Sequence, residues 1–81
     1  MADSISLSAL TVGASAVVKS YPIKGTTFIR LREMGLLPGT RIILMRSAPM
    51  GDPLEIKVRG YNLTLRKAEA DHISVEPIED K

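Results

Sequence analysis

The chain has 81 residues, 44% of them hydrophobic, which suits one small domain that folds unaided and leaves no room for a second. It contains no cysteine, which excludes a disulfide scaffold, a zinc ribbon, an iron–sulfur cluster and a thiol nucleophile. We expect a cytosolic protein with no membrane insertion. The domain is small and has no disulfides, its N-terminus is unlike a signal peptide, and its apolar runs have only about four residues.

Charge is unevenly distributed along the chain, although the net charge is only +2. Residues 19–67 hold ten basic and three acidic side chains, a balance of +7, whereas residues 68–81 hold five acidic and one basic, a balance of −4. A basic body of this kind attracts acidic partner surfaces, and an acidic end also serves simply to solvate the C-terminus.

Short apolar strands separated by turn residues account for most of the chain. Leu54, Ile56 and Val58 alternate with charged residues in the clearest period-two pattern, and Gly60–Asn62 is predicted to be the hairpin turn that follows. The apolar run within residues 41–46 is long enough for a strand covered on both faces. We expect strands over residues 5–7, 16–21, 41–46, 54–59, 63–66 and 73–75.

One helix of about two turns is predicted from Thr27 to Met34, because Phe28 and Leu31 recur with Met34 on one apolar face. Gly35 follows where a left-handed residue would end the helix. Arg32 falls on the apolar side, and its aliphatic stem is expected to lie over Phe28. Residues 67–71 are expected to form a single further helical turn.

The fold class expected from these elements is mainly β, a small SH3-like β-barrel of five to six strands with one short inserted α-helix. Closing a sheet on itself buries its apolar face and removes exposed edges. We expect a single domain over residues 1–76 and a charged C-terminal tail over residues 77–81.

Residues that would support catalysis are few. His72 is the only histidine, and with Glu69 and Asp71 nearby it invites a metal-site hypothesis, although a surface histidine is the simpler interpretation. Gly51 and Gly60 are isolated, so no glycine-rich phosphate loop is present. We therefore expect no enzyme activity, no catalytic or metal-ligating residues, and no cofactor.

Nucleic-acid binding is an alternative function, because small barrels often bind RNA or DNA and the middle of this chain is basic. Arg41 and Arg46 flank an apolar strand, and Lys57, Arg59 and Arg66 line the outward faces of the hairpin. Only Tyr21, Phe28 and Tyr61 are aromatic, and single-strand binding usually needs exposed aromatic side chains for stacking. We therefore expect no nucleic-acid partner.

The order of the turn residues and core leucines resembles the FeoA family. The fragments that carry the resemblance are Arg30–Thr40 (RLREMGLLPGT), Ala48–Pro53 (APMGDP), Val58–Tyr61 (VRGY) and Leu63–Ala70 (LTLRKAEA), and it extends from about Leu7 to Glu76. This resemblance implies an SH3-like barrel that accompanies the ferrous-iron transporter FeoB, through contact with the cytosolic GTP-binding portion of that membrane protein. A related domain ends the iron- and manganese-dependent repressors, but the present chain has no upstream DNA-binding helices.

The helix and its adjoining loops form the candidate partner-binding surface. The residues predicted to contribute are Phe28, Arg32, Leu36, Leu37, Met50 and Arg59. Leu36, Leu37 and Met50 are more apolar than turns require, but Leu36 and Leu37 would equally serve to plug the end of the barrel. Arg32 or Arg59 is conceivable as an arginine finger on a GTPase, although nothing in the sequence favours it. An uncovered strand edge would also permit a homodimer.

Overall fold

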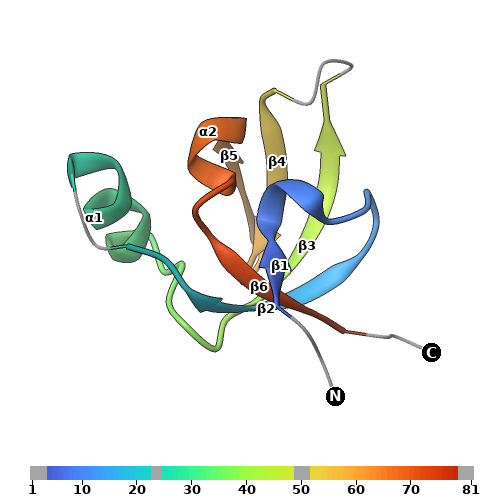
Figure 1. Ribbon diagram of the computed structural model, residues 1–81, viewed down its shortest axis with the longest axis horizontal. Coiled ribbons are helices and arrows are strands. Elements are labelled where there is room, and N and C mark those ends of the chain that lie inside the picture. The colour runs from blue at the N-terminus through green and yellow to red at the C-terminus, as the bar shows by residue number, and fades with distance from the viewer. Residues whose placement is uncertain (1–3, 23–24, 49–51, 79–81) are drawn as a thin grey trace.

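A computed structural model describes residues 4–22, 25–48 and 52–78 of the chain. One antiparallel sheet curls around the core, and the helix α1 stands beside it (Figure 1). The elements are β1 (Ile5–Ser6), the 3₁₀ turn η1 (Leu7–Ala9), β2 (Ser15–Ser20), α1 (Gly25–Glu33), β3 (Arg41–Ser47), β4 (Leu54–Val58), β5 (Tyr61–Leu65), α2 (Lys67–Ala70) and β6 (Ser74–Ile78). The strand order is β1-β6-β2-β3-β4-β5, which confirms the mainly β architecture.

The core is entirely aliphatic. Leu54, Ile56 and Val58 point inward from β4, as their alternation predicted, and they meet Leu63 and Leu65 from β5. The largest fully buried side chains are Leu7, Leu36, Ile42, Leu44, Ile56, Leu65, Ile73, Val18, Val58 and Val75. Branched side chains from every strand except the short β1 therefore fill the interior without an aromatic ring.

Strand β3 has only one covered face. Ile42 and Leu44 are buried, whereas Ile43 is half-buried and Met45 is 43% exposed. The expectation of cover on both faces was therefore wrong, because an antiparallel sheet can leave its outer face to solvent. The outer face of β3 is consequently available for contact.

The hairpin turn between β4 and β5 lies one residue earlier than predicted. Val58 pairs with Tyr61, so Arg59 and Gly60 alone form the turn, with φ of 50° and 94°. Positive φ at both central residues is the type I′ geometry, whose twist matches that of the flanking strands. Tyr61 therefore belongs to β5 and not to the turn.

Helix α1 begins two residues before the predicted Thr27 and ends one residue before the predicted Met34. Gly35 terminates it as expected, at a φ of 101°. The N–H of Leu36 donates to the carbonyl of Leu31 at 3.1 Å, and the N–H of Gly35 donates to that of Arg32 at 3.0 Å. This pair of bonds is a Schellman motif, in which a left-handed residue satisfies the last carbonyls of a helix.

Strand β6 continues through Pro77 to Ile78, so the strand runs two residues into the expected tail. Pro77 lies opposite Ala16 of β2, beyond the point where β1 pairs with Val75. Among residues 4–22, 25–48 and 52–78, no strand pairs with Pro77 on its other side, and such an edge tolerates a residue that has no N–H to donate.

Helix α1 is an insertion between two strands that are neighbours in the sheet. The N–H of Gly39 donates to the carbonyl of Val18 at 2.7 Å, and the N–H of Val18 donates to that of Thr40 at 2.9 Å. These bonds bring the two ends of the α1 segment together at one point of the barrel. The helix is thus presented as an appendage whose base is fixed by the sheet.

Candidate partner-binding surface

The inner side of α1 is held to the barrel by a short row of rings. Tyr21 and Phe28 stack with centroids 5.9 Å apart, and the ring of His72 lies edge-on to Phe28 at 6.3 Å. The Tyr21 hydroxyl donates a hydrogen bond to the carbonyl of Leu36. Burial raises the pKa of Tyr21, partly offset by the nearby Arg32 guanidinium, so the phenol keeps the proton that it donates. Phe28, expected to contact a partner, is half-buried in this row.

Leu36 and Leu37 are neighbours with opposite environments. Leu36 is fully buried in the same core cluster as Leu31, which agrees with the alternative that it plugs the end of the barrel and contradicts its candidate role as an exposed anchor. Leu37 is 39% exposed, as its candidate role requires. The Schellman motif explains the difference, because the residue after the left-handed glycine turns back onto the last turn of the helix.

Two further exposed side chains precede Leu37 in the chain. Met34 at the end of α1 is 40% exposed, and Arg32 is also exposed. A hollow of about 250 Å³ lies between α1 and the end of β2, lined by Ser20, Tyr21, Arg32, Leu37 and Pro38. Of the remaining predicted residues, Met50 lies outside the described residues.

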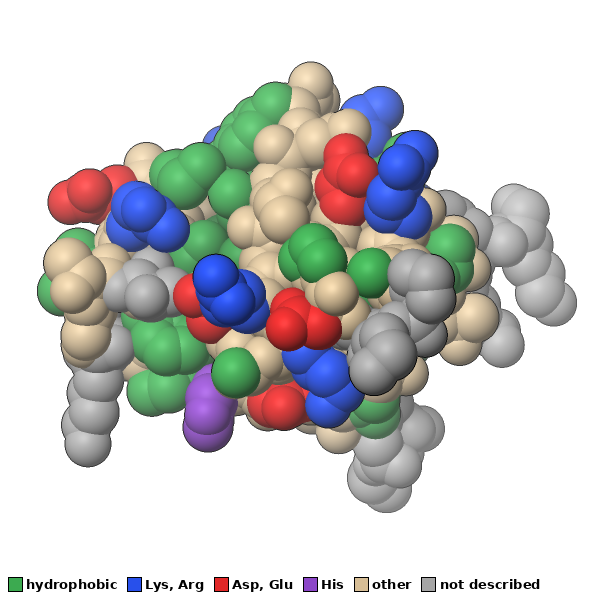
Figure 2. Space-filling model, turned by 90° about the horizontal axis from the view of Figure 1, so that it is seen from above, with side chains coloured by type: hydrophobic (Ala, Val, Ile, Leu, Met, Phe, Trp, Pro, Cys, Tyr) green, Lys and Arg blue, Asp and Glu red, His purple; other side chains and the backbone are tan. Residues whose placement is uncertain are grey.

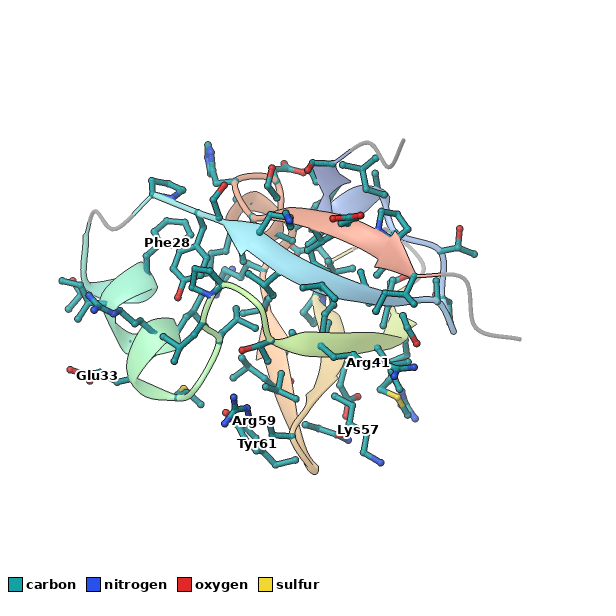
Figure 3. The ribbon with its side chains drawn as sticks, turned by 90° about the horizontal axis from the view of Figure 1, so that it is seen from below. Phe28, Glu33, Arg41, Lys57, Arg59 and Tyr61 are labelled. Atoms are coloured by element: carbon teal, nitrogen blue, oxygen red, sulfur yellow. The ribbon has the colours of Figure 1, made fainter. Side chains whose placement is uncertain are left out.

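The β4–β5 hairpin extends this surface. Figure 3 shows Arg59 and Tyr61 at the tip of the hairpin. The Tyr61 hydroxyl is 3.5 Å from where a Cβ on Gly35 would lie, which places the hairpin beside the end of α1. We call Arg32, Met34, Leu37, Arg59 and Tyr61 the end surface. Met34 was expected on the apolar face of the helix and Tyr61 in a turn, so neither was predicted to belong to this surface. The available signal for Tyr61 was an aromatic residue directly after a turn glycine.

The three residues of the metal-site hypothesis are engaged separately. The Asp71 carboxylate accepts a hydrogen bond from the Ser8 hydroxyl, which together with the Lys67 ammonium 3.6 Å away lowers the pKa of Asp71. Glu69 accepts a hydrogen bond from the backbone N–H of Arg66 at 3.0 Å. Within residues 4–22, 25–48 and 52–78, no three such side chains gather as a metal-binding group. The same ranges contain no helix long and apolar enough to cross a membrane.

The chain forms a six-stranded curled sheet with a helix inserted between β2 and β3 and with exposed apolar side chains at one end. These features define a small SH3-like binding domain. The model of the FeoA domain matches residues 5–77, so the chain belongs to the FeoA family. The resemblance inferred from the sequence is thereby confirmed. The family has its role in ferrous-iron transport.

Solved structures of FeoA proteins have the same fold. A FeoA-like protein from Clostridium acetobutylicum is 33% identical with a TM-score of 0.86, covering 100% of this chain and 94% of that one. FeoA from Chlorobium tepidum is 36% identical with a TM-score of 0.87, covering 95% and 74%. FeoA from Stenotrophomonas maltophilia, described as a prokaryotic SH3 domain protein complexed with zinc, is 32% identical with a TM-score of 0.77, covering 88% of each chain.

A curated relative from Porphyromonas gingivalis is a fusion of Fe(2+) transport protein A with the Fe(2+) transporter FeoB. It is 36% identical over 72 residues, which are 89% of the present chain and 8% of that protein. The present chain thus spans a small part of that relative. A manganese-dependent transcriptional repressor shares the fold alone, with a TM-score of 0.82 at 14% identity over 96% of this chain.

Proposed function

We propose that this chain is a cytosolic accessory protein of ferrous-iron uptake, which binds the cytosolic GTP-binding portion of FeoB through the end surface. The observation that carries the proposal is the exposure of three apolar side chains at one end of the barrel. Met34, Leu37 and Tyr61 are each 38–40% exposed there, whereas the core of the barrel is aliphatic and buried. Partly exposed apolar and aromatic side chains flanked by arginines are typical of protein interfaces. No catalytic step is assigned to the chain.

The fused relative supports the choice of partner. In that protein the FeoA and FeoB parts belong to one polypeptide, which holds them at a high effective concentration. A separate FeoA chain needs a surface that replaces the covalent link. The end surface is suited to this task because Met34 and Leu37, 40% and 39% exposed, belong to the segment of α1, which stands beside the sheet (Figure 1).

The test is a titration of the isotope-labelled chain with the purified G domain of the transporter. We expect resonance shifts in α1, in the loop after it and at Tyr61, and we expect Leu37→Asp to weaken binding at least about tenfold, as loss of a central apolar anchor does. Val12→Asp is the matched control, since Val12 is 53% exposed and belongs to the loop between η1 and β2. Figure 1 shows this loop on the opposite side of the barrel from α1.

Two results would contradict the proposal. One is the absence of any resonance shift at G-domain concentrations near one millimolar, which excludes even a weak specific complex (Kd of about 1 mM, about −4 kcal/mol). The other is an equal loss of binding in Leu37→Asp and Val12→Asp, which would show that the location of the substituted residue is irrelevant.

A further inference from the structure

A groove on the outer face of the sheet concentrates positive charge. Its volume is about 380 Å³, and its lining residues are Gly39, Thr40, Arg41, Ile43, Lys57, Arg59 and Gly60. Cross-strand pairing of Ile43 with Lys57 places an aliphatic floor beside an ammonium group. Figure 3 shows Arg41, Lys57 and Arg59 on this side of the sheet, seen from below. Lys57 and Arg59 supply the positive charge of what we call the basic groove, which Arg41 also lines, and none of the described lining residues is acidic.

Two basic side chains elsewhere on the barrel lie beside acidic neighbours. Lys19 pairs with Glu76 at 3.3 Å, and Arg46 pairs with Glu55 at 3.4 Å. The face seen from above in Figure 2 likewise carries positive and negative side chains close to one another. Over the described ranges, in contrast, Lys57 has no ion-pair partner. Arg59 has none there either, so the groove keeps a positive potential that attracts anions.

Arg59 occupies a strained position. Its φ of 50° is in the left-handed region, at the first central residue of a type I′ turn. Asn, Asp and Gly adopt this conformation readily, whereas a long side chain with a Cβ does so at a cost. A turn that only had to reverse the chain would be more stable with one of those residues. Strained residues cluster at functional sites, and here the strain brings a guanidinium to the rim of the basic groove.

We infer that the basic groove binds a carboxylate-rich segment of the protein partner proposed above, next to the apolar contact of the end surface. The identity of the partner rests on the proposed function, whereas the chemistry of the groove does not. Charge complementarity calls for an anionic segment, and the Ile43 floor accommodates the methylene groups of glutamate. The described lining contains no aromatic ring on which a base could stack, which favours an acidic peptide over single-stranded nucleic acid.

The experiment measures binding of a fluorescein-labelled hexaglutamate peptide to the full chain by fluorescence anisotropy. At low salt we expect Arg59→Asn and Lys57→Gln each to weaken binding about twofold to fivefold, the range of a single exposed ion pair. Arg46→Gln removes the same charge from a paired residue outside the groove, and we expect it to leave the affinity within about twofold of wild type. Arg59→Asn keeps a residue that suits the turn, so its fold is retained.

Three results would overturn the inference. One is no peptide binding at about 20 mM salt, where electrostatic attraction is screened little. The others are a loss of affinity in Arg46→Gln equal to that in Arg59→Asn, and tighter binding of a single-stranded oligothymidylate with the same dependence on Arg59. Leu37→Asp separates the two proposals, because it should weaken G-domain binding at least about tenfold and leave peptide binding intact. If the peptide fails to bind while the G domain still binds, the groove inference is wrong and the proposed function stands.

Discussion

Replacing Leu36 or Leu37 with alanine makes the same chemical change at adjacent positions of opposite exposure. Leu36 is fully buried and packs with Leu31, whereas Leu37 is 39% exposed on the end surface. The first substitution should therefore act on folding and the second on binding. The pair is therefore a direct test of the Schellman geometry at the end of α1.

The expected magnitudes differ clearly. Removing a fully buried leucine side chain costs about 3 kcal/mol, within a general range of about 2–5 kcal/mol that includes the cavity left behind. Leu37 is 39% exposed and so loses only part of this burial, about 1 kcal/mol. The whole domain is stable by about 4–12 kcal/mol, so Leu36→Ala removes a large share of it.

Thermal unfolding followed by circular dichroism measures the difference. At about 4–8 °C per kcal/mol for a domain of this size, Leu36→Ala should lower Tm by about 12–24 °C and Leu37→Ala by about 4–8 °C. Below its Tm, Leu36→Ala should bind the G domain within about threefold of wild type, whereas Leu37→Ala should bind about tenfold more weakly. Equal Tm shifts for the two variants, or a larger shift for Leu37→Ala, would refute the assignment of Leu36 to the core.

Three further substitutions have defined outcomes. Arg59→Asn should raise the free energy of unfolding by about 0.5–1 kcal/mol by relieving the left-handed strain. A lower free energy of unfolding, measured by urea denaturation, would contradict this. Tyr21→Phe should cost about 0.5–1.5 kcal/mol by deleting the hydrogen bond to the Leu36 carbonyl, measured in the same way; an unchanged midpoint would mean that this bond adds nothing. The Ser8 hydroxyl holds the pKa of Asp71 below its ordinary value of 3.8, so the native state binds fewer protons than the unfolded state. That stabilisation is present above pH 3.8 and is lost as pH falls through the lower native pKa. Asp71→Asn should therefore reduce the slope of the unfolding free energy against pH between about pH 2 and 5. An unchanged slope would show that Asp71 is not responsible.

Local sequence patterns predicted most of the fold. Alternation at Leu54, Ile56 and Val58 gave a half-buried strand, and the glycine at position 35 marked the end of the helix. Both depend only on residues within one element. The error at β3 arose because a run of apolar residues does not say whether a second layer covers the sheet, and Met45 turned out to be exposed.

The candidate surface was harder to predict because it joins segments distant in the sequence. The contact between Gly35 and Tyr61 depends on the order of strands in the sheet, which no local pattern states. Leu36 and Leu37 look alike in the sequence, and only the direction of the chain after Gly35 separates them. The strain at Arg59 likewise depended on knowing that the turn has two residues and not three.

The closed base of the α1 segment has a consequence for how the domain can vary. Since Val18 is bonded to both Gly39 and Thr40, the sheet already brings the ends of the segment together, whatever lies between them. Lengthening such a closed segment costs little, about 0.6 kcal/mol for each doubling. The barrel can therefore present helices of different length and outer sequence while its own register stays fixed, provided that Leu31 and Leu36 continue to fill the core. Recognition of a partner can in this way be retuned independently of the scaffold.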